Sequence, residues 1–368
     1  MNILDHIVQR ETETDDVKVM QNLKNAENLR IPLVMWGCGE VAERVYIWLN
    51  KNNIKLSGVF IDGNPGGLIF HGIEVVCGLN GICEKYRTFN VIIAHKNGYA
   101  SGGALKNRCE NIADIYALEM GVLYPVEPVD IDFIVKNIES FQCSYDYLSD
   151  ELSQKSYLAY LNAKINKSYK GLDLYLSEPQ YFCEDIIKFT PDEVFVDCGA
   201  YDGDSVLSFA GQIKSRPGSG YEAVYAFEPD DINFAKLSAL SPEIKNLHCI
   251  KKGAWDKRDL LQFNSEGTGM SAIRDAGNIV IETDTIDGVL QGRRASFIKM
   301  DIEGSELNAL KGAEKTIKKY KPRLVVSAYH KACDLIKIPQ YIKSLVPEYK
   351  LYFRLHKYGT IDSVIYAV

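Results

Sequence analysis

Hydrophobic positions cluster in short runs of strand length, separated by glycine turns and by stretches with helical spacing. Before residue 100 these runs are IPLVMWG, LSGVFID and NVIIAH. After residue 190 they are EVFVDCG, AVYAFEP, LHCIKKGAW, SFIKMDIEG, PRLVVSAYH, KLYFRLHKYG and SVIYAV. Strands that alternate with helices favour a parallel sheet covered on both faces. The last two runs have no helix between them, so they predict an antiparallel hairpin.

The pattern divides the 368 residues into four parts. Residues 1–30 predict a helical lead-in, and residues 31–128 predict a small Rossmann-like α/β domain. Residues 129–190 predict a helical linker, in which recurrent Tyr and Leu form packing faces. Residues 191–368 predict a doubly wound α/β sheet of seven strands. Two globular units agree with the usual domain size of roughly 100–200 residues.

Composition and charge argue against some classes of function but do not identify one. The chain is 46% hydrophobic and 25% charged, as expected of a globular protein. A formal net charge of −7 argues against binding to the phosphate backbone of nucleic acids. No apolar run approaches the roughly 20 residues that span a bilayer. Nine cysteines without a C-x-x-C pair, and an N-terminus unlike a signal peptide, predict a reducing cytoplasm.

The stretch VFVDCGAYDGDS at 194–205 joins an apolar strand to a helix through a glycine-rich turn. Such a turn lets a ligand approach the backbone closely. Its aspartates (Asp197, Asp202 and Asp204) would repel a pyrophosphate, but they suit the sulfonium and ammonium groups of S-adenosylmethionine (SAM). We therefore expect contacts to this cofactor from Asp197, Gly199, Ala200, Gly203, Asp204 and Ser205.

Two further strand ends complete the predicted cofactor site. Glu228 and Pro229 follow the next strand, where an acceptor-only carboxylate can bind both ribose hydroxyls. The alternative is an acidic residue that serves only the helix N-terminus. The third strand brings Ala254 and Trp255 to the same edge, and Trp255 either borders the adenine or belongs to the core.

Ionisable residues mark the ends of the fourth and fifth strands. In FIKMDIEGSE, Lys299 and Asp301 share one strand face and Glu303 follows at the turn. Such groups are costly inside a sheet unless paired or functional, so we expect Lys299, Asp301 and Glu303 to act in catalysis, and Asp301 also to contact the cofactor. The alternative is a structural Lys299–Asp301 ion pair. His330 ends the neighbouring strand and is the fourth predicted catalytic residue. An acceptor pocket could also be lined by Tyr329, Arg354, His356 and Tyr358.

From about residue 181 to the end, the chain resembles the FkbM family of SAM-dependent methyltransferases. The matching stretches are VFVDCGAYDGDS, AFEPD, GAWDKRD, TDTIDGVL, KMDIEGSELNALKGA and SAYH. The resemblance implies a class I methyltransferase fold and SAM as the methyl donor. It also implies O-methylation of a sugar, glycan or secondary metabolite. By the same resemblance, Asp197, Gly199 and Glu228 hold SAM, whereas Asp301, Glu303 and His330 face the acceptor.

The first third of the chain lies outside this resemblance. Gly37, Gly39 and Ala42 form G-x-G-x-x-A after a strand, and Asp62 ends the next strand, as in a nucleotide-binding half-domain. This part is similar to the N-terminal domains of sugar acyltransferases that hold a nucleotide sugar. A docking or structural domain is an equally good interpretation.

Two alternatives remain open. The first is an NAD-dependent or catalytically silent nucleotide-binding module. The acidic turn at 197–204 argues against NAD, and a silent module would keep this turn without needing Asp301, Glu303 and His330 together. The second is a metal-dependent enzyme, because Asp301, Glu303 and His330 could supply ligands. Their spacing matches no compact metal motif, so we expect no metal.

Overall fold

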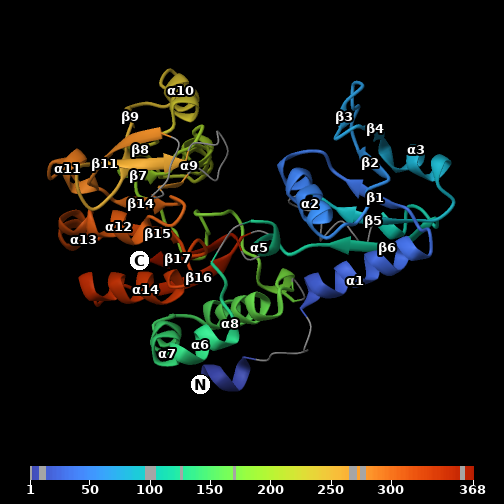
Figure 1. Cartoon of the computed structure of the whole chain (residues 1–368). Coiled ribbons are helices and arrows are strands. Elements are labelled where there is room, and N and C mark those ends of the chain that lie inside the picture. The colour runs from blue at the N-terminus through green and yellow to red at the C-terminus, as the bar shows by residue number, and fades with distance from the viewer. Residues whose placement is uncertain are drawn as a thin grey trace.

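The computed structural model describes residues 2–7, 14–95, 105–124, 127–168, 171–264, 272–273, 279–356 and 361–368. It contains two large sheets that lie side by side, with the short helix α5 (Met120–Leu123) between them (Figure 1). The protein is thus an α/β molecule, as the sequence pattern predicts.

The first sheet has six strands in the order β3-β4-β2-β1-β5-β6, and every pair in it is parallel except β3 with β4. The three apolar runs predicted as strands are confirmed as β1, β2 and β5. The bounds are β1 (Leu33–Trp36), β2 (Gly58–Ile61), β3 (Ile69–Phe70), β4 (Ile73–Cys77), β5 (Phe89–Ile93) and β6 (Ile112–Ala117).

Among the described residues, the helices that accompany this sheet are α1 (Asp15–Asn28), α2 (Glu40–Lys51) and α3 (Gly78–Lys85). The amphipathic α2 buries Val41, Val45 and Leu49. A disulfide joins Cys83 in α3 to Cys109. The scattered spacing of the cysteines does not predict this link.

The second sheet has seven strands in the order β16-β17-β15-β14-β7-β8-β9. These are the seven predicted runs, and the expected antiparallel hairpin is the β16–β17 pair. Strand β17 is also antiparallel to β15, whereas the other pairs are parallel. The bounds are β7 (Glu193–Cys198), β8 (Tyr221–Phe227), β9 (Leu247–Ile250), β14 (Phe297–Met300), β15 (Arg323–Ser327), β16 (Leu351–Leu355) and β17 (Ser363–Ala367).

Side chains on both faces of this sheet are buried, as a doubly wound fold requires. In β7, Val194, Val196 and Cys198 belong to one apolar cluster and Phe195 to another. Phe195 stacks on Phe209 with ring centroids 4.5 Å apart. The helices of this part are α9 (Asp204–Ser215), α10 (Asp231–Ala239), α11 (Ile286–Leu290), α12 (Glu306–Lys311), α13 (Glu314–Tyr320) and α14 (Asp334–Leu345).

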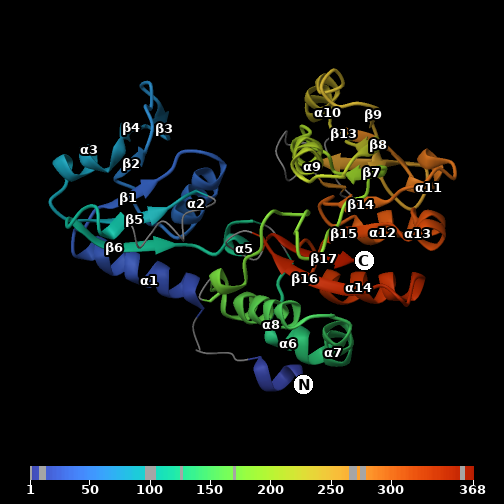
Figure 2. The ribbon, with the colours of Figure 1, turned by 180° about the vertical axis from the view of Figure 1, so that it is seen from behind.

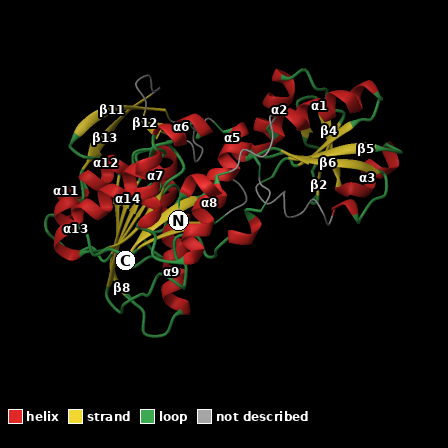
Figure 3. Cartoon of the chain, turned by 90° about the horizontal axis from the view of Figure 1, so that it is seen from below, coloured by secondary structure: helices red, strands yellow, loops and turns green. Residues whose placement is uncertain are grey.

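The segment predicted as a helical linker packs closely on the second sheet. Figure 2 shows its helices next to α14 and β16, and Figure 3 shows α7 and α8 next to α14. Tyr157 and Tyr160 of α8 meet Phe353 of β16 edge to face, with centroid distances of 5.3 and 5.6 Å. The N-terminal η1 (Ile3–His6) reaches the same group, where the amide of Ile3 donates to Gln142 at 2.9 Å. The bounds are α6 (Ile131–Lys136), α7 (Ile138–Asp146), α8 (Glu151–Asn166) and η2 (Asp173–Tyr175).

One strand ends earlier than its sequence predicts. The run LHCIKKGAW is not a single strand, because the amide of Lys252 donates to the Ile250 carbonyl at 2.8 Å and closes a tight turn. The chain then enters a separate four-stranded sheet in the order β10-β13-β11-β12. The sequence pattern does not predict this sheet, whose strands are β10 (Gly253–Ala254), β11 (Asp259–Asn264), β12 (Ala272–Ile273) and β13 (Ile279–Asp284). Within the described ranges, no helix is both long and apolar enough to cross a membrane.

Candidate active site

The glycine turn after β7 lies directly against the end of β14. Gly199 has φ +78°, and a Cβ at this position would lie 2.0 Å from the carbonyl oxygen of Asp301. The amides of Gly199 and Ala200 both donate to the Phe227 carbonyl at the end of β8. The turn therefore joins three strand ends, and only glycine fits at position 199.

Asp197 is fully buried and is the charge at the centre of this turn. Its Oδ2 accepts a hydrogen bond from the Ser205 hydroxyl at 2.5 Å, and its Oδ1 lies 3.0 Å from the Lys299 ammonium. Lys299 is only 3% exposed and also donates to the Gly199 carbonyl at 2.8 Å. The ion pair considered from the sequence was Lys299 with Asp301, but Lys299 pairs with Asp197 across the neighbouring strand.

Gly203 caps the N-terminus of α9 in the left-handed region, at φ +93°. Asp204 begins the helix in an exposed position, and its Oδ1 accepts from the Ser205 amide at 2.6 Å. A carboxylate in the first turn complements the helix dipole, so Asp204 has a structural role as well as a place at the turn.

Glu228 is buried at the carboxyl end of β8. Its Oε2 accepts from the Tyr201 amide and its Oε1 from the Asp230 amide, both at 2.9 Å. Burial raises the pKa of Glu228 to about 7, although these two hydrogen bonds oppose the shift. Pro229 lies between Glu228 and Asp230, which caps α10 by accepting from the amides of Ile232 and Asn233.

Asp301 follows β14 and is held by two tyrosines. The hydroxyl of Tyr181 donates to its Oδ2 at 2.6 Å, and the hydroxyl of Tyr329 to its Oδ1 at 3.2 Å. Burial alone would raise the pKa of Asp301, but the charges of His330 and Lys299 outweigh it and lower the pKa. Asp301 is therefore ionised in this site.

His330 lies among three carboxylates. Its Nε2 is 3.6 Å from Asp301 Oδ1 and 3.5 Å from Glu303 Oε2, and its Nδ1 is 3.0 Å from Glu306 Oε1. Burial alone would lower the pKa of His330, but the charges of Glu306 and Glu303 raise it well above its usual value. Burial also raises the pKa of Glu303.

The structure thus brings the four predicted catalytic residues to one edge of the sheet, beside the glycine turn. It adds Tyr181 and Glu306, which the sequence analysis did not single out. Glu306 is buried, and its Oε1 accepts from the Ile302 amide at 2.9 Å. Glu306 could have been predicted from the sequence, because it follows Glu303 by three positions, nearly one helical turn.

One known protein family matches the part of the chain that contains this site. Residues 197–358 match a family described as "Methyltransferase FkbM domain". This part of the chain is an FkbM methyltransferase domain. No curated protein matches the chain.

One solved structure of similar length shares the fold, and others align over about half of the chain with much lower TM-scores. The methyltransferase FkbM from Methylobacillus flagellatus KT aligns with a TM-score of 0.67 and 24% identity, over 92% of this chain and 90% of that one. An rRNA methylase from Streptococcus thermophilus aligns at 0.32 and 16% identity, over 49% and 87%. Aeropyrum pernix fibrillarin with natively bound SAM aligns at 0.31 and 9% identity, over 49% and 67%.

Other residues that the sequence predicts around the FkbM methyltransferase site have their own contacts elsewhere in the domain. Ala254 and Trp255 follow the shortened β9 and lie at β10, where the Trp255 amide donates to the Asp284 carbonyl. Arg354 is buried in ion pairs with Asp150 and Asp185 at 2.6 and 2.7 Å. The sequence predicted Arg354 in an acceptor pocket. In the structure its guanidinium instead faces Asp150, at the start of α8, and Asp185.

His356 is likewise buried. Its Nδ1 lies 2.6 Å from the Ser177 carbonyl, and the Tyr366 hydroxyl lies 2.8 Å from its Nε2. Both ring nitrogens therefore have protein partners, which favours a packing role over acceptor binding. Tyr358 lies outside the described residues.

In the first sheet, outside the FkbM methyltransferase domain, the glycine turn after β1 also packs closely against a neighbouring strand end. Gly37 has φ +125°, and a Cβ there would lie 2.5 Å from the Ala94 carbonyl of the β5 end. Gly39 caps α2. Asp62 accepts from the Trp36 indole at 3.1 Å and lies 3.7 Å from Arg108, so its carboxylate already has partners.

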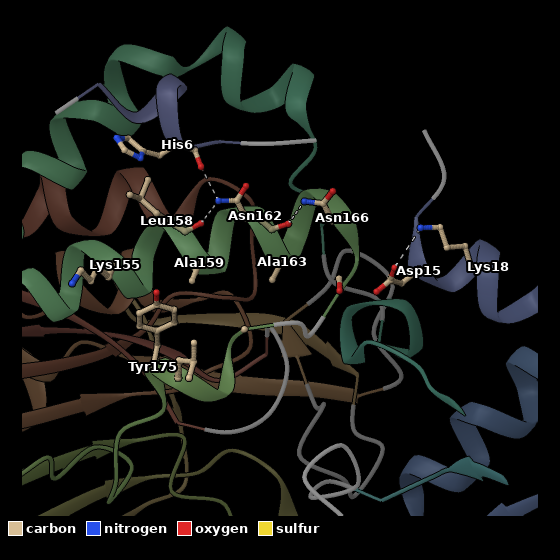
Figure 4. A pocket seen from close by; sticks show the side chains of 13 residues that line it. His6, Asp15, Lys18, Lys155, Leu158, Ala159, Asn162, Ala163, Asn166 and Tyr175 are labelled. Carbon is tan, nitrogen blue, oxygen red and sulfur yellow. Dashed lines mark hydrogen bonds and ion pairs between the residues drawn. The ribbon is translucent and has the colours of Figure 1, made fainter. Parts of the chain in front are cut away.

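A pocket of about 450 Å³ lies elsewhere, between α1, α8 and η2 (Figure 4). Asn162 on its wall donates to the His6 carbonyl at 3.0 Å. Its lining includes Lys155 and Tyr175 but no predicted cofactor or catalytic residue. This pocket is therefore separate from the predicted cofactor and catalytic residues.

Proposed function

We propose that the protein transfers a methyl group from SAM to a hydroxyl of a sugar, glycan or secondary metabolite. One observation carries this proposal: the acidic glycine turn at 197–204, Glu228 and the Asp301 cluster gather at the carboxyl edge of one sheet. Ligands of open α/β sheets bind at this edge. The FkbM match supports methyl transfer, and the acidic turn supports a cationic donor.

The cofactor would lie over the turn between β7 and α9. Gly199 lets this turn lie directly against the end of β14. Glu228 offers its remaining acceptor lone pairs to the ribose hydroxyls. Asp202 and Asp204 provide negative charge that favours the sulfonium and ammonium groups and disfavours the pyrophosphate of NAD. Asp197 is paired with the buried Lys299 and would shape the turn that holds the cofactor.

The transfer needs alignment and removal of one proton. The bond between sulfur and the methyl carbon breaks as the acceptor oxygen forms its bond to that carbon, and the sulfonium becomes a neutral thioether. The hydroxyl proton leaves to the Asp301 carboxylate, which Tyr181 and Tyr329 hold in place. His330 and Glu303, beside Asp301, line the acceptor side.

The N-terminal sheet would present an acceptor that carries a nucleotide. Strand order places β1 between β2 and β5, and the crevice between β1 and β5 is the point where nucleotides bind in such sheets. Gly37 and Gly39 lie at this crevice. Burial and the charge of Asp202 raise the pKa of Tyr201 in the cofactor turn, and the charge of Glu40, the residue after Gly39, adds to this shift. A nucleotide sugar is therefore our first acceptor class.

Asp301→Asn tests this assignment, because the amide keeps the size of the side chain but removes its basic charge. We expect methyl incorporation from SAM into the accepted nucleotide sugar or glycan to fall by about 10²–10⁴-fold, the usual contribution of a positioned base. The affinity for S-adenosylhomocysteine should stay nearly unchanged.

The matched control is Asp192→Asn, which removes a half-exposed carboxylate paired with Arg294 outside the site. It should leave turnover unchanged. Wild-type turnover in Asp301→Asn would show that the base lies elsewhere. Calorimetry that detects NAD but neither SAM nor S-adenosylhomocysteine would overturn the proposed function.

A further inference from the structure

Two of the three carboxylates around His330 lie at distances that suit metal ligands better than hydrogen-bond acceptors. Nε2 lies 3.6 Å from Asp301 Oδ1 and 3.5 Å from Glu303 Oε2, which is too long for a normal N–H···O bond. With bond lengths of about 2.1 Å, two ligands on a tetrahedral Zn²⁺ lie about 3.4 Å apart. Ligand atoms of Asp301, Glu306 and His330 lie within 4.8 Å of one another. Small side-chain movements would bring them onto one ion.

The imidazole of His330 is buried, but its hydrogen-bonding capacity is not satisfied. The His330 side chain is 6% exposed, and within the described ranges neither of its ring nitrogens makes a hydrogen bond of acceptable geometry. Oε2 of the buried Glu306 also has no hydrogen-bond partner there. Buried polar atoms are nearly always paired, because leaving them unpaired costs free energy. A bound cation would satisfy both groups at once.

The charges around the cluster also favour a cation. Three carboxylates (Asp301, Glu303 and Glu306) surround a single imidazole. Lys299 is paired with Asp197, and the Lys331 ammonium donates to the Gly304 carbonyl. The remaining negative charge is a suitable environment for a divalent ion, for which one imidazole and several carboxylate oxygens form a common donor set.

We propose that Asp301, Glu306 and His330, with Glu303 as a further ligand, bind one divalent transition-metal ion, with Zn²⁺ as the first choice. This inference builds on the proposed function, because the ion would lie on the acceptor side of the methyl-transfer site. It would hold the acceptor oxygen and lower the pKa of its hydroxyl, whose proton then passes to water. Asp301 would in that case orient the oxygen through the ion.

Calorimetric titration of the full chain, first freed of metal with a chelator, tests the site without any turnover assay. ZnCl₂ and MnCl₂ are the probes, added in the absence of SAM and acceptor. We expect one ion per chain in the wild type. His330→Ala and Glu303→Gln should weaken binding by more than about tenfold, as loss of a ligand contact does.

His248→Ala is the matched control, because it removes an exposed histidine of β9 that stacks on Tyr225. It should bind the ion as the wild type does. Circular dichroism verifies that each variant is folded, and the partly exposed Glu303 provides a mild substitution if His330→Ala is not. Zn²⁺ should also raise the melting temperature of the wild type but not of Glu303→Gln.

The outcomes separate this inference from the proposed function. Absence of binding in the wild type, or equal binding in the wild type and both site variants, would overturn the metal site. A parallel titration with S-adenosylhomocysteine then tests the cofactor assignment independently. Metal binding without cofactor binding would keep the metal site and remove the proposed function, whereas the reverse would remove only the metal site.

Discussion

Glu228 is held by two backbone amides, one on each carboxylate oxygen. This arrangement fixes the carboxylate and still leaves each oxygen a lone pair for a ribose hydroxyl. Burial makes the ionised form costly, so the proposed contact to the cofactor depends on the protonation state of this one residue.

The pH dependence of cofactor affinity follows from that burial. The pKa of Glu228 is about 7, above its usual value of about 4.3. Ribose hydroxyls donate to the ionised form, so affinity for S-adenosylhomocysteine should be full above this pKa. It should fall as the pH drops through about 7, by at most about tenfold per pH unit. Calorimetry between about pH 6 and pH 8.5 measures this slope, which Glu228→Gln should abolish. A flat wild-type profile would contradict the prediction.

Removing the carboxylate should weaken binding at any pH at which it is ionised. We expect Glu228→Ala to cost about 1.5–3 kcal/mol of S-adenosylhomocysteine affinity, the range for hydrogen bonds to a charged group. Asp231→Ala, at the neighbouring and exposed start of α10, is a suitable control and should bind normally. Equal affinity of Glu228→Ala and wild type would remove Glu228 from the cofactor site.

At the scale of elements, α8 and β16 are joined by charge as well as by aromatic packing. Asp150 caps α8, where its Oδ1 accepts from the Ser153 amide at 2.7 Å, and it pairs with the buried Arg354. A buried guanidinium that loses a partner is strongly destabilising. The start of α8 is therefore coupled to the outer strand of the sheet.

Two substitutions at Asp150 separate these contributions. Asp150→Asn keeps an N-cap acceptor but loses the charge, whereas Asp150→Ala loses both. We expect Asp150→Ala to lower the free energy of unfolding by about 1 kcal/mol more than Asp150→Asn, the typical value of an N-cap. Urea denaturation measures both values. Equal stability of the two variants would show that the cap contributes nothing here.

At the scale of the whole molecule, the described residues between 129 and 190 pack on the seven-stranded sheet. Tyr157 and Tyr160 cover Phe353 in β16, and the Tyr181 hydroxyl holds Asp301. The first sheet is connected to this part by contacts such as the one between the hydroxyl of Tyr124, which follows α5, and Glu40 of α2 at 3.3 Å. No proposed cofactor contact comes from the first sheet, so we expect its removal to be tolerated better than removal of the helices.

Truncation tests this arrangement. A chain that begins at Asp130 should fold and bind S-adenosylhomocysteine as the full chain does, because every proposed cofactor contact follows residue 190. A chain that begins at residue 191 should fail to fold, because it exposes Phe353 and leaves Arg354 without Asp150 and Asp185. Circular dichroism and calorimetry report both outcomes. A folded Asp130 chain without ligand binding would mean that the first sheet completes the cofactor site.

The sequence by itself determined the seven-stranded sheet, its terminal hairpin and the edge at which the ionisable residues gather. Apolar runs of strand length and the glycine turn are local signals, and the parallel order brings successive strand ends together. Asp197, Gly199, Glu228, Asp301 and His330 could therefore be placed at one edge before their contacts were known.

Only the tertiary structure decided which of these groups meet. Lys299 pairs with Asp197 rather than Asp301 because β14 lies beside β7, a register that no local pattern specifies. Tyr181 reaches Asp301 from a segment 120 positions away along the chain. Arg354 turned out to serve packing because α8 covers β16. Contacts between distant segments depend on how whole elements pack, and that information is spread over the entire chain.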